Sequence, residues 1–426
     1  MSAKRVKIGL IGLGTVGSGV YRTLKAFEHI EIAKIAVRDK NKPRNIPDLD
    51  QSILTENPLE VVNNPEIEIV IELIGGIEPA FGLIQTAVEN GKHIVTANKE
   101  LLAKHGEELF NIAEKHNRVI LYEAAIAGGI PIIMPIKTIL TGNNITKIEA
   151  ILNGTTNYIL TKMDLQGLSY EEALKEAQEL GYAEADPASD VEGFDAAYKI
   201  TTLATLAFKE RVKLDKVYRE GITKINAQDM KIANELGYKI KLTASAYFDE
   251  NNNADVRVHP MLIPKQNTLA HIDYVTNAVS LTGHPIGEIT LSGPGAGAFP
   301  TASSVTGDVL AIAAEIGTTD YLLPQMRCRH RKTANVINIL DTENRYYLLI
   351  EAANVKGVTG KIGAICAENN ISLKSFIQKD ISENNTAAIV IITEKAVERD
   401  MLNAISEFKK DESIINVNNL IRVQLY

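Results

Sequence analysis

A dense group of carboxylates precedes a single lysine in residues 181–200, GYAEADPASDVEGFDAAYKI. Ser189 and Glu192 have the spacing of a capping box, which predicts a helix beginning near Asp190. On that helix Asp195 and Lys199 are four residues apart and share one face. Neighbouring carboxylates stabilise an ammonium group, and a positioned ammonium can protonate the alkoxide that forms when a carbonyl is reduced. The structural alternative is an exposed ion pair worth well under ~1 kcal/mol.

The same acidic stretch has a second chemical use. Carboxylates such as those of Glu184 and Asp190 can hold the ammonium group of a substrate. Lys99 ends the segment Thr96-Ala97-Asn98-Lys99, which follows an apolar run and lies where open α/β sheets bind their ligands. From this position Lys99 either reaches a cofactor or substrate, or enters the next helix with its charged end in water.

A glycine motif near the amino end predicts a dinucleotide site. Gly12-Leu13-Gly14-Thr15-Val16-Gly17 is a G-x-G-x-x-G at the end of the apolar stretch 6–14 and the start of a helical pattern. The first glycine allows the tight turn, the second allows backbone to approach a pyrophosphate, and the third allows close helix–strand packing. The alternative, a glycine-rich turn with no ligand, is less consistent with a first β-α-β unit.

The choice of dinucleotide depends on the end of the second expected strand, Arg38-Asp39-Lys40. Arg38 and Lys40 are suited to a ribose 2′-phosphate, whereas Asp39 is suited to the 2′-hydroxyl of NAD. We expect NADP, with NAD and a merely solvated charge cluster as the alternatives.

Two glycine-containing loops suggest close backbone approach. Residues 123–131, EAAIAGGIP, place the Glu123 carboxylate beside small residues whose carbonyl groups are hard-cation ligands, unless the loop is only a turn. Residues 293–301, GPGAGAFPT, predict a tight turn before a helix beginning near Ser303. The 8 histidines form no H-x-x-H or Cys/His grouping, so we expect no transition-metal site.

The elements that position these residues indicate an α/β fold. Apolar runs at 6–14, 31–37, 67–73, 93–97 and 118–124 alternate with helical patterns, which predicts a Rossmann-type parallel sheet. A mixed α+β region follows, with a capping-box helix from Ser169 and a hairpin around 249–254. After residue 345 the order βαββαβ predicts a ferredoxin-like domain. We expect domains at 1–135, 136–330 and 346–426.

Composition narrows the range of functions that the chain can have. The 426 residues carry a net charge of −8, which argues against a general nucleic-acid or anionic-membrane surface. No apolar run approaches the ~20 residues of a membrane helix. Two cysteines, Cys328 and Cys366, argue against a disulfide framework and for a reducing, cytoplasmic location, and leave open a redox role.

Taken together, the motifs resemble the homoserine dehydrogenase family. The resemblance covers nearly the whole chain: GLGTVG, VTANKELL, YEAAIAGGIP, ILNGTTNYIL, GYAEADPASDVEGFDAAYKI, VHPMLIP and GPGAGAFPTASSV. It implies reversible NAD(P)H-dependent reduction of L-aspartate 4-semialdehyde to L-homoserine, in threonine, methionine and isoleucine biosynthesis. The alternatives are another Rossmann reductase of an amino-acid aldehyde, and an inactive amino-acid sensor.

The resemblance also assigns roles. It makes Lys199 the proton donor, which Asp195 orients unless Asp195 contacts the substrate directly, and it places Lys99 between nicotinamide and substrate. It makes Glu184 the ligand of the substrate amino group and Asp190 a further acidic residue of the substrate site. Further positions match cofactor contacts (Leu13, Thr15, Val16, Gly75, Gly181 and Gly297) and a sodium site (Glu123, Ile126, Gly128 and Ile130).

Residues 346–426 resemble an ACT domain. Its ligand loop, D-x-P-G-V-L, corresponds here to residues 354–359, in which Gly357 and Val358 match, but Asn354 replaces the acidic residue. The resemblance implies feedback inhibition by L-threonine and self-association into a homodimer or homotetramer. A role in assembly alone is the alternative.

Overall fold

A computed structural model describes residues 5–251, 253–316, 330, 332–381 and 386–424. Contacts divide the chain into two compact units. The first comprises residues 1–152, 195–215 and 276–334, and the second comprises residues 153–194, 216–275 and 335–426. The three domains expected from the sequence stay a prediction. Within the described residues, no helix is both long and apolar enough to cross a membrane.

The first unit is built on a parallel six-stranded sheet, which confirms the predicted Rossmann-type arrangement. Its strand order is β3-β2-β1-β4-β5-β6. The order reverses between β1 and β4, and in open sheets of this kind ligands bind at the strand ends beside such a reversal. The strands are β1 (Val6–Ile11), β2 (Ile30–Ala36), β3 (Leu54–Thr55), β4 (Ile69–Glu72), β5 (His93–Thr96) and β6 (Ile120–Leu121).

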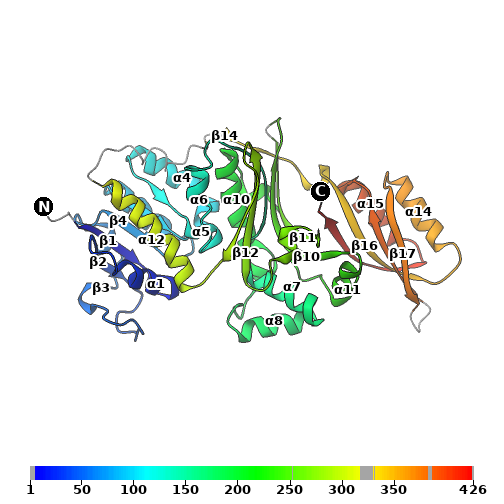
Figure 1. Cartoon of the computed structure of the whole chain (residues 1–426), viewed down its shortest axis with the longest axis horizontal. Coiled ribbons are helices and arrows are strands. Elements are labelled where there is room, and N and C mark those ends of the chain that lie inside the picture. The colour runs from blue at the N-terminus through cyan, green and yellow to red at the C-terminus, as the bar shows by residue number, and fades with distance from the viewer. Residues whose placement is uncertain (1–4, 252, 317–329, 331, 382–385, 425–426) are drawn as a thin grey trace. The chain divides into compact units, whose positions relative to one another are not determined.

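Helices cover both faces of this sheet because each strand is apolar on both sides. One face packs against α1 (Thr15–Leu24) and α12 (Ala298–Glu315), which lie side by side (Figure 1). The other packs against α3 (Ala80–Glu89) and α4 (Lys99–Lys115). Helix α12 begins at Ala298, so the expected start near Ser303 was wrong. Gly19 permits the close α1–α12 packing, because a Cβ there would lie 2.5 Å from the Ala298 carbonyl oxygen.

The remainder of the first unit includes helix α10 (Phe194–Phe208), of which all but the first residue belong to this unit. Strands β7 (Asn144–Ile151), β12 (Thr276–His284) and β13 (Gly287–Pro294) pair antiparallel. The smaller elements are α2 (Leu59–Val62), α5 (Ala124–Ala127), α6 (Ile133–Lys137), β8 (Glu210–Arg211), β14 (Lys332–Thr333) and 3₁₀ turns at Gln51–Ile53 and Leu214–Lys216, the last of which starts in this unit.

The second unit contains one continuous sheet with the strand order β10-β11-β20-β16-β18-β17. The predicted hairpin is present, since β10 (Tyr238–Phe248) and β11 (Asn253–Pro264) pair antiparallel. The predicted βαββαβ order is also present from β16 onward. Its elements are β16 (Glu343–Ala353), α14 (Val358–Glu368), β17 (Leu373–Ile381), β18 (Thr386–Thr393), α15 (Glu398–Phe408) and β20 (Ile414–Val423).

The last strand joins the two parts of this sheet. β20 pairs antiparallel with β16 and parallel with β11, where Met261 lies opposite Arg422. The C-terminal domain is therefore hydrogen-bonded to β11 within its own unit. The remaining elements are α7 (Gly154–Gln166), α8 (Tyr170–Glu179), α9 (Ala188–Val191), β9 (Tyr218–Arg219), α11 (Ala227–Glu235), β15 (Asn335–Val336), β19 (Ala396–Val397) and 3₁₀ turns at Thr268–His271 and Ile339–Asp341. The predicted capping box of Ser169 and Glu172 is formed at the start of α8.

Candidate active site

Helix α10 carries the lysine and the carboxylate that the sequence singled out. It begins at Phe194 rather than near Asp190, because Gly193 adopts a φ of +79° and separates α10 from the short helix α9. The expected capping box of Ser189 and Glu192 is therefore wrong, and α9 has no side-chain cap. The burial of α10 was predicted correctly: its first turn and the apolar run after Lys199 are largely inaccessible to solvent.

Asp195 is the centre of an ion cluster in the first unit. Lys199 lies one turn further along α10, and its Nζ is 2.7 Å from Asp195 Oδ2. Lys99, the first residue of α4, forms an ion pair with Asp195 Oδ1. The Asp195 side chain is 3% exposed, that of Lys199 10% and that of Lys99 43%. Lys199 also donates a hydrogen bond to the Leu152 carbonyl oxygen at 2.7 Å.

The two lysines keep Asp195 ionised. Burial opposes the charge of the carboxylate, but the positive charges of Lys199 and Lys99 and their hydrogen bonds outweigh it, so the pKa of Asp195 lies well below its ordinary value. With both lysines protonated, the cluster has two positive charges and one negative charge. Its excess positive charge is suited to an oxygen atom that becomes negative during a reaction.

A buried carboxylate missed by the sequence analysis organises the loops beside Lys99. Glu72, at the end of β4, is completely buried, and its Oε2 accepts a hydrogen bond from Thr96 Oγ1 at 2.7 Å. Its Oε1 accepts backbone hydrogen bonds from Ile74 and Gly75 at 2.8 and 3.1 Å. Asn98 then caps α4 by accepting from the Leu101 amide at 3.1 Å. The available signal was an acidic residue at the end of an otherwise apolar strand.

The glycine motif borders a cavity of about 760 Å³ at the carboxyl ends of β1, β2 and β4. Gly12 has a φ of +101°, and a Cβ there would lie 2.9 Å from the Leu73 carbonyl oxygen. Gly14 has open space where a Cβ would be, whereas a Cβ on Gly17 would lie 2.2 Å from the Gly12 carbonyl oxygen. The first and third glycines thus serve the turn and the packing, and the second leaves room for a ligand.

The cavity brings together several of the predicted cofactor residues. Gly12, Leu13, Gly14, Arg38 and Gly75 line it, together with Asp39, Lys42 and Arg44. Thr15 and Val16 begin α1 directly after the glycine turn. Gly297, the N-cap of α12, belongs to the same unit but not to the cavity lining, and Gly181, which follows α8, belongs to the second unit.

The loop after β6 is folded around Glu123. The Glu123 carboxylate is 95% buried and accepts hydrogen bonds from three successive backbone amides, those of Ile132, Ile133 and Met134, at 2.5–2.7 Å. Ile126 and Ile130 are buried in the same loop. The Gly128 carbonyl oxygen accepts from Ser304 Oγ at 2.6 Å.

A second buried carboxyl group adjoins Glu123. Asp308 of α12 accepts the backbone N–H of Glu123 through its Oδ2 at 2.8 Å. Burial and the negative charge of Glu123 raise the pKa of Asp308 to about 8. At neutral pH Asp308 is therefore mainly protonated.

The proposed ligands of a substrate ammonium group belong to the second unit. Asp190 Oδ1 accepts a hydrogen bond from Asn153 Nδ2 at 2.7 Å, and Asn153 caps helix α7. Glu184 is exposed, and its backbone carbonyl oxygen accepts from Gln178 Nε2 at 3.1 Å. Asn153 is a positioning residue that sequence reasoning missed, because its partner lies 37 residues away in the chain.

The candidate effector residues follow β16. Gly357 adopts a φ of +93° and precedes α14, whose first residue, Val358, is buried. Asn354 lies between β16 and this turn. Cys366 on α14 is buried and has a free thiol whose pKa is raised to about 11 by burial, whereas Cys328 lies outside the described residues.

An ammonium pair on a buried carboxylate, in the same unit as a dinucleotide-type glycine loop, is suited to carbonyl reduction. The class of protein that this combination defines is the NAD(P)-dependent oxidoreductases. Matches to protein-family models identify a narrower group within this class. Residues 12–123 match "Homoserine dehydrogenase, NAD binding domain", residues 131–310 match "Homoserine dehydrogenase", and residues 346–412 match "ACT domain".

Individual relatives agree with these models. A homoserine dehydrogenase of Synechocystis is 43% identical, and the match spans 98% of this chain and 99% of the relative. The crystal structure of a homoserine dehydrogenase from Thiobacillus denitrificans is 37% identical with a TM-score of 0.92, and covers 99% of this chain and 98% of its own. A hyperthermophilic archaeal homoserine dehydrogenase in complex with NADPH is 28% identical with a TM-score of 0.62, over 73% of this chain and 98% of its own. The chain belongs to the homoserine dehydrogenase family.

The pKa of Asp308 predicts how stability depends on pH. The folded state holds a proton up to about pH 8, whereas the unfolded chain releases it near 3.8, so between these values the folded state binds more protons. This contribution to the free energy of unfolding is therefore lost as pH rises toward 8, with a slope of at most ~1.4 kcal/mol per pH unit. Urea unfolding in sodium-free buffer from pH 5 to 8 measures it.

Asp308→Asn has no proton to lose and should flatten this dependence. Glu89→Gln, which changes an exposed carboxylate of the same unit, should follow the original protein and serves as the control. An equally steep dependence in Asp308→Asn would show that Asp308 is already ionised at neutral pH.

Proposed function

We propose that the chain interconverts L-aspartate 4-semialdehyde and L-homoserine and that Lys199 transfers the proton. The observation that carries this proposal is the pair of lysines on the buried carboxylate of Asp195. A bound NADPH supplies a hydride to the aldehyde carbon. The C=O π electrons then move to the oxygen, which takes a proton from the Lys199 ammonium and becomes the hydroxyl of homoserine.

The partners of Lys199 fit this role. Asp195 and the Leu152 carbonyl hold its nitrogen in place and so orient the three N–H donors of the ammonium group. Lys99 shares Asp195 and adds a second positive charge, which lowers the energy of the developing alkoxide. Because both Asp195 oxygens interact with lysines, we assign Asp195 the orienting role rather than direct contact with the substrate.

Substrate binding requires a negative site for the amino group. We assign this role to Glu184 and Asp190, and the hydrogen bond from Asn153 fixes one oxygen of Asp190 for it. A carboxylate that faces an ammonium group also gives a charge-assisted hydrogen bond, which is stronger than a neutral one.

NADP is the cofactor that the cavity favours. Three basic side chains, those of Arg38, Lys42 and Arg44, line it near the end of β2, where a ribose 2′-phosphate binds in this fold. Asp39 lines the same cavity and is suited to the ribose 2′-hydroxyl of NAD, so we propose NAD as the weaker cofactor. The NADPH complex of the archaeal relative is consistent with this choice. Gly297 and Gly181 are proposed to contact the cofactor from outside this lining.

A sodium ion is compatible with the Glu123 loop. Three amides occupy three of the about four lone-pair sites of the Glu123 carboxylate, and the Gly128 carbonyl has one more site beside that used by Ser304. These oxygens, with the carbonyl groups of Ile126 and Ile130, make up a donor set of the hard-oxygen type. The ion would fix the backbone of this loop.

The C-terminal ACT domain indicates that the enzyme is regulated by an effector. We propose L-threonine as the effector, bound at the loop of Asn354, Gly357 and Val358, in a homodimer or homotetramer. The left-handed Gly357 opens a turn ahead of α14, so a ligand there meets free backbone amides of that helix. A cytoplasmic location is consistent with the free, buried Cys366.

Removing the proton donor tests the mechanism. Lys199→Ala should lower kcat for homoserine oxidation by about 10²–10⁴-fold, the usual contribution of a general acid or base. The dissociation constant for NADPH, measured by its fluorescence, should change less than twofold because Lys199 does not line the cavity. Lys104→Ala, on the surface of α4, is the control and should retain full kcat. Normal turnover in Lys199→Ala would exclude it as the donor.

Cofactor preference is tested at Arg38. Arg38→Ala should lower kcat/KM for NADP about tenfold or more through the loss of a charge-assisted contact, and leave kcat/KM for NAD nearly unchanged. Lys40→Ala provides the matched control, since Lys40 is exposed and not part of the cavity lining. Equal losses with both dinucleotides would place Arg38 away from the 2′-phosphate.

The effector assignment is tested by titrating L-threonine into the homoserine oxidation assay. The original enzyme should be inhibited, and Asn354→Ala should need about tenfold more threonine because one ligand hydrogen bond is lost. Asn416→Ala, an exposed asparagine on β20, should retain the original inhibition curve. A response to threonine that is identical in all three proteins would exclude this loop as the effector site.

A further inference from the structure

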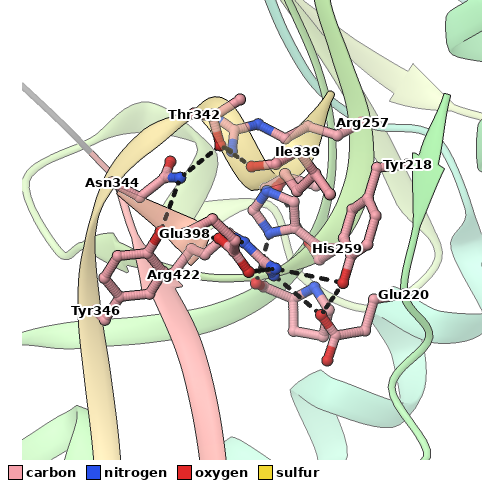
Figure 2. Close-up of polar contacts among 12 residues, drawn as sticks. Tyr218, Glu220, Arg257, His259, Ile339, Thr342, Asn344, Tyr346, Glu398 and Arg422 are labelled. Carbon is pink, nitrogen blue, oxygen red and sulfur yellow. Dashed lines mark hydrogen bonds and ion pairs between the residues drawn. The ribbon is translucent and has the colours of Figure 1, made fainter. Parts of the chain in front are cut away.

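A buried ion network connects the C-terminal domain to β9 and the residues that follow it. Arg422 on β20 interacts with Glu398 of α15 through two nitrogens, with Nε 2.9 Å from Glu398 Oε2. Its Nη1 donates to Glu220 Oε2 at 2.9 Å. Figure 2 shows the Arg422 guanidinium between these two carboxylates, with Tyr218 beside Glu220.

This network is largely sealed from water. The side chains of Arg422 and Glu398 are 4% and 2% exposed, and that of Glu220 is 22% exposed. The Tyr218 hydroxyl donates to Glu220 Oε2 at 3.0 Å, and Tyr346 of β16 donates to Glu398 Oε2 at 2.8 Å. Because a buried charge without its partner is costly, the parts that carry these side chains have one favoured arrangement.

The residues after Tyr218 hold the segment 191–194, which leads into α10. The Ile222 amide donates to the Val191 carbonyl at 2.9 Å. Arg219 donates to the Glu192 carbonyl, and its guanidinium carbon lies 3.5 Å from the centre of the Phe194 ring. The packing is close, since a Cβ on Gly221 would lie 2.3 Å from the Val191 carbonyl oxygen.

This segment lies between two groups of functional residues. Asp190 precedes it and Asp195 follows it in the chain, and in the proposed function these residues serve the substrate ammonium group and the proton donor. A shift of segment 191–194 changes the position of Asp190 directly, because Asp190 adjoins this segment in the chain. Geometry changes of about 1 Å are sufficient to change substrate affinity and rate.

We propose that Arg422, Glu220 and Arg219 are positioning residues for the substrate site. Arg422 holds Glu220 by a hydrogen bond. Glu220 directly follows Arg219 in the chain, and Arg219 contacts Glu192 and Phe194. The C-terminal domain thereby sets the position of Asp190. The inference rests on the proposed role of Asp190 and adds the connection by which a distant domain controls substrate affinity.

The experiment measures KM for L-homoserine at saturating NADP in single and double variants. Glu220→Ala removes the link to Arg422 but leaves the Arg422–Glu398 pair, and should raise KM by about two- to thirtyfold, the range for residues that couple distant sites. kcat should change less than KM, because Asp195 is also held by Lys99 and Lys199. The dissociation constant for NADPH should change less than twofold, because no residue of the network lines the dinucleotide cavity.

Four further variants separate positioning from general damage. Glu220→Gln retains the acceptor oxygen and should restore most of the original KM. Arg219→Met should raise KM at least as much as Glu220→Ala. The double variant should show no further rise, because the two residues act in series. Asp341→Ala, which breaks the exposed pair with Arg399 on α15, should leave KM unchanged.

An unchanged KM in folded Glu220→Ala, or a double variant whose KM increase is the product of the single increases, would overturn the proposal. If Glu220→Ala does not fold by circular dichroism, Tyr218→Phe takes its place, since it removes only a hydroxyl that bonds Glu220 and Arg422. Asp190→Asn tests the underlying assignment separately: an unchanged KM there, with a raised KM in Arg219→Met, would reject Asp190 as the ligand and retain the positioning of the segment.

Discussion

A single carboxylate, that of Asp195, interacts with two ammonium groups that come from different helices, and the chemistry proposed for the first unit depends on it. The carboxylate is almost fully buried, so its charge is tolerable only because Lys199 and Lys99 compensate it. The same compensation gives the site its excess positive charge. Helix α10 supplies two of these three side chains, Asp195 and Lys199. The third, Lys99, begins α4 just after the ends of β4 and β5, which Glu72 holds together.

The dinucleotide cavity and the lysine pair lie in one unit, which is assembled from three separate stretches of chain. The parallel sheet is formed by the first stretch, but one of its helices, α12, comes from residues 298–315. The hydrogen bond between Glu123 and Asp308 joins the same two stretches. The dinucleotide cavity and the residues proposed for proton transfer therefore belong to the first unit, whereas the residues proposed for the substrate ammonium group belong to the second unit.

The C-terminal domain is more than an appended module. Its last strand extends the sheet of β11, and its Arg422 is enclosed by carboxylates from both parts of the second unit. In the proposal above, this construction is the means by which a domain with its own core influences a distant substrate site. A shared sheet and a buried ion network transmit displacement because both have few alternative arrangements.

Structural features that depend on residues close together in the chain could be predicted from the sequence. Strand and helix patterns, the glycine turn, the pairing of Asp195 with Lys199 and the βαββαβ order follow from local spacing, since residues a few positions apart are fixed relative to each other by the backbone. Contacts between groups that are far apart in the chain were visible only in the tertiary structure. Lys99 on Asp195, Asp308 on Glu123 and Arg422 on Glu220 join residues 96, 185 and 202 positions apart, and no local pattern encodes such contacts. Local reasoning failed at Ser189 and Glu192 for the same reason: Glu192 is held by Arg219 and Thr223, so tertiary contacts took the place of the capping box.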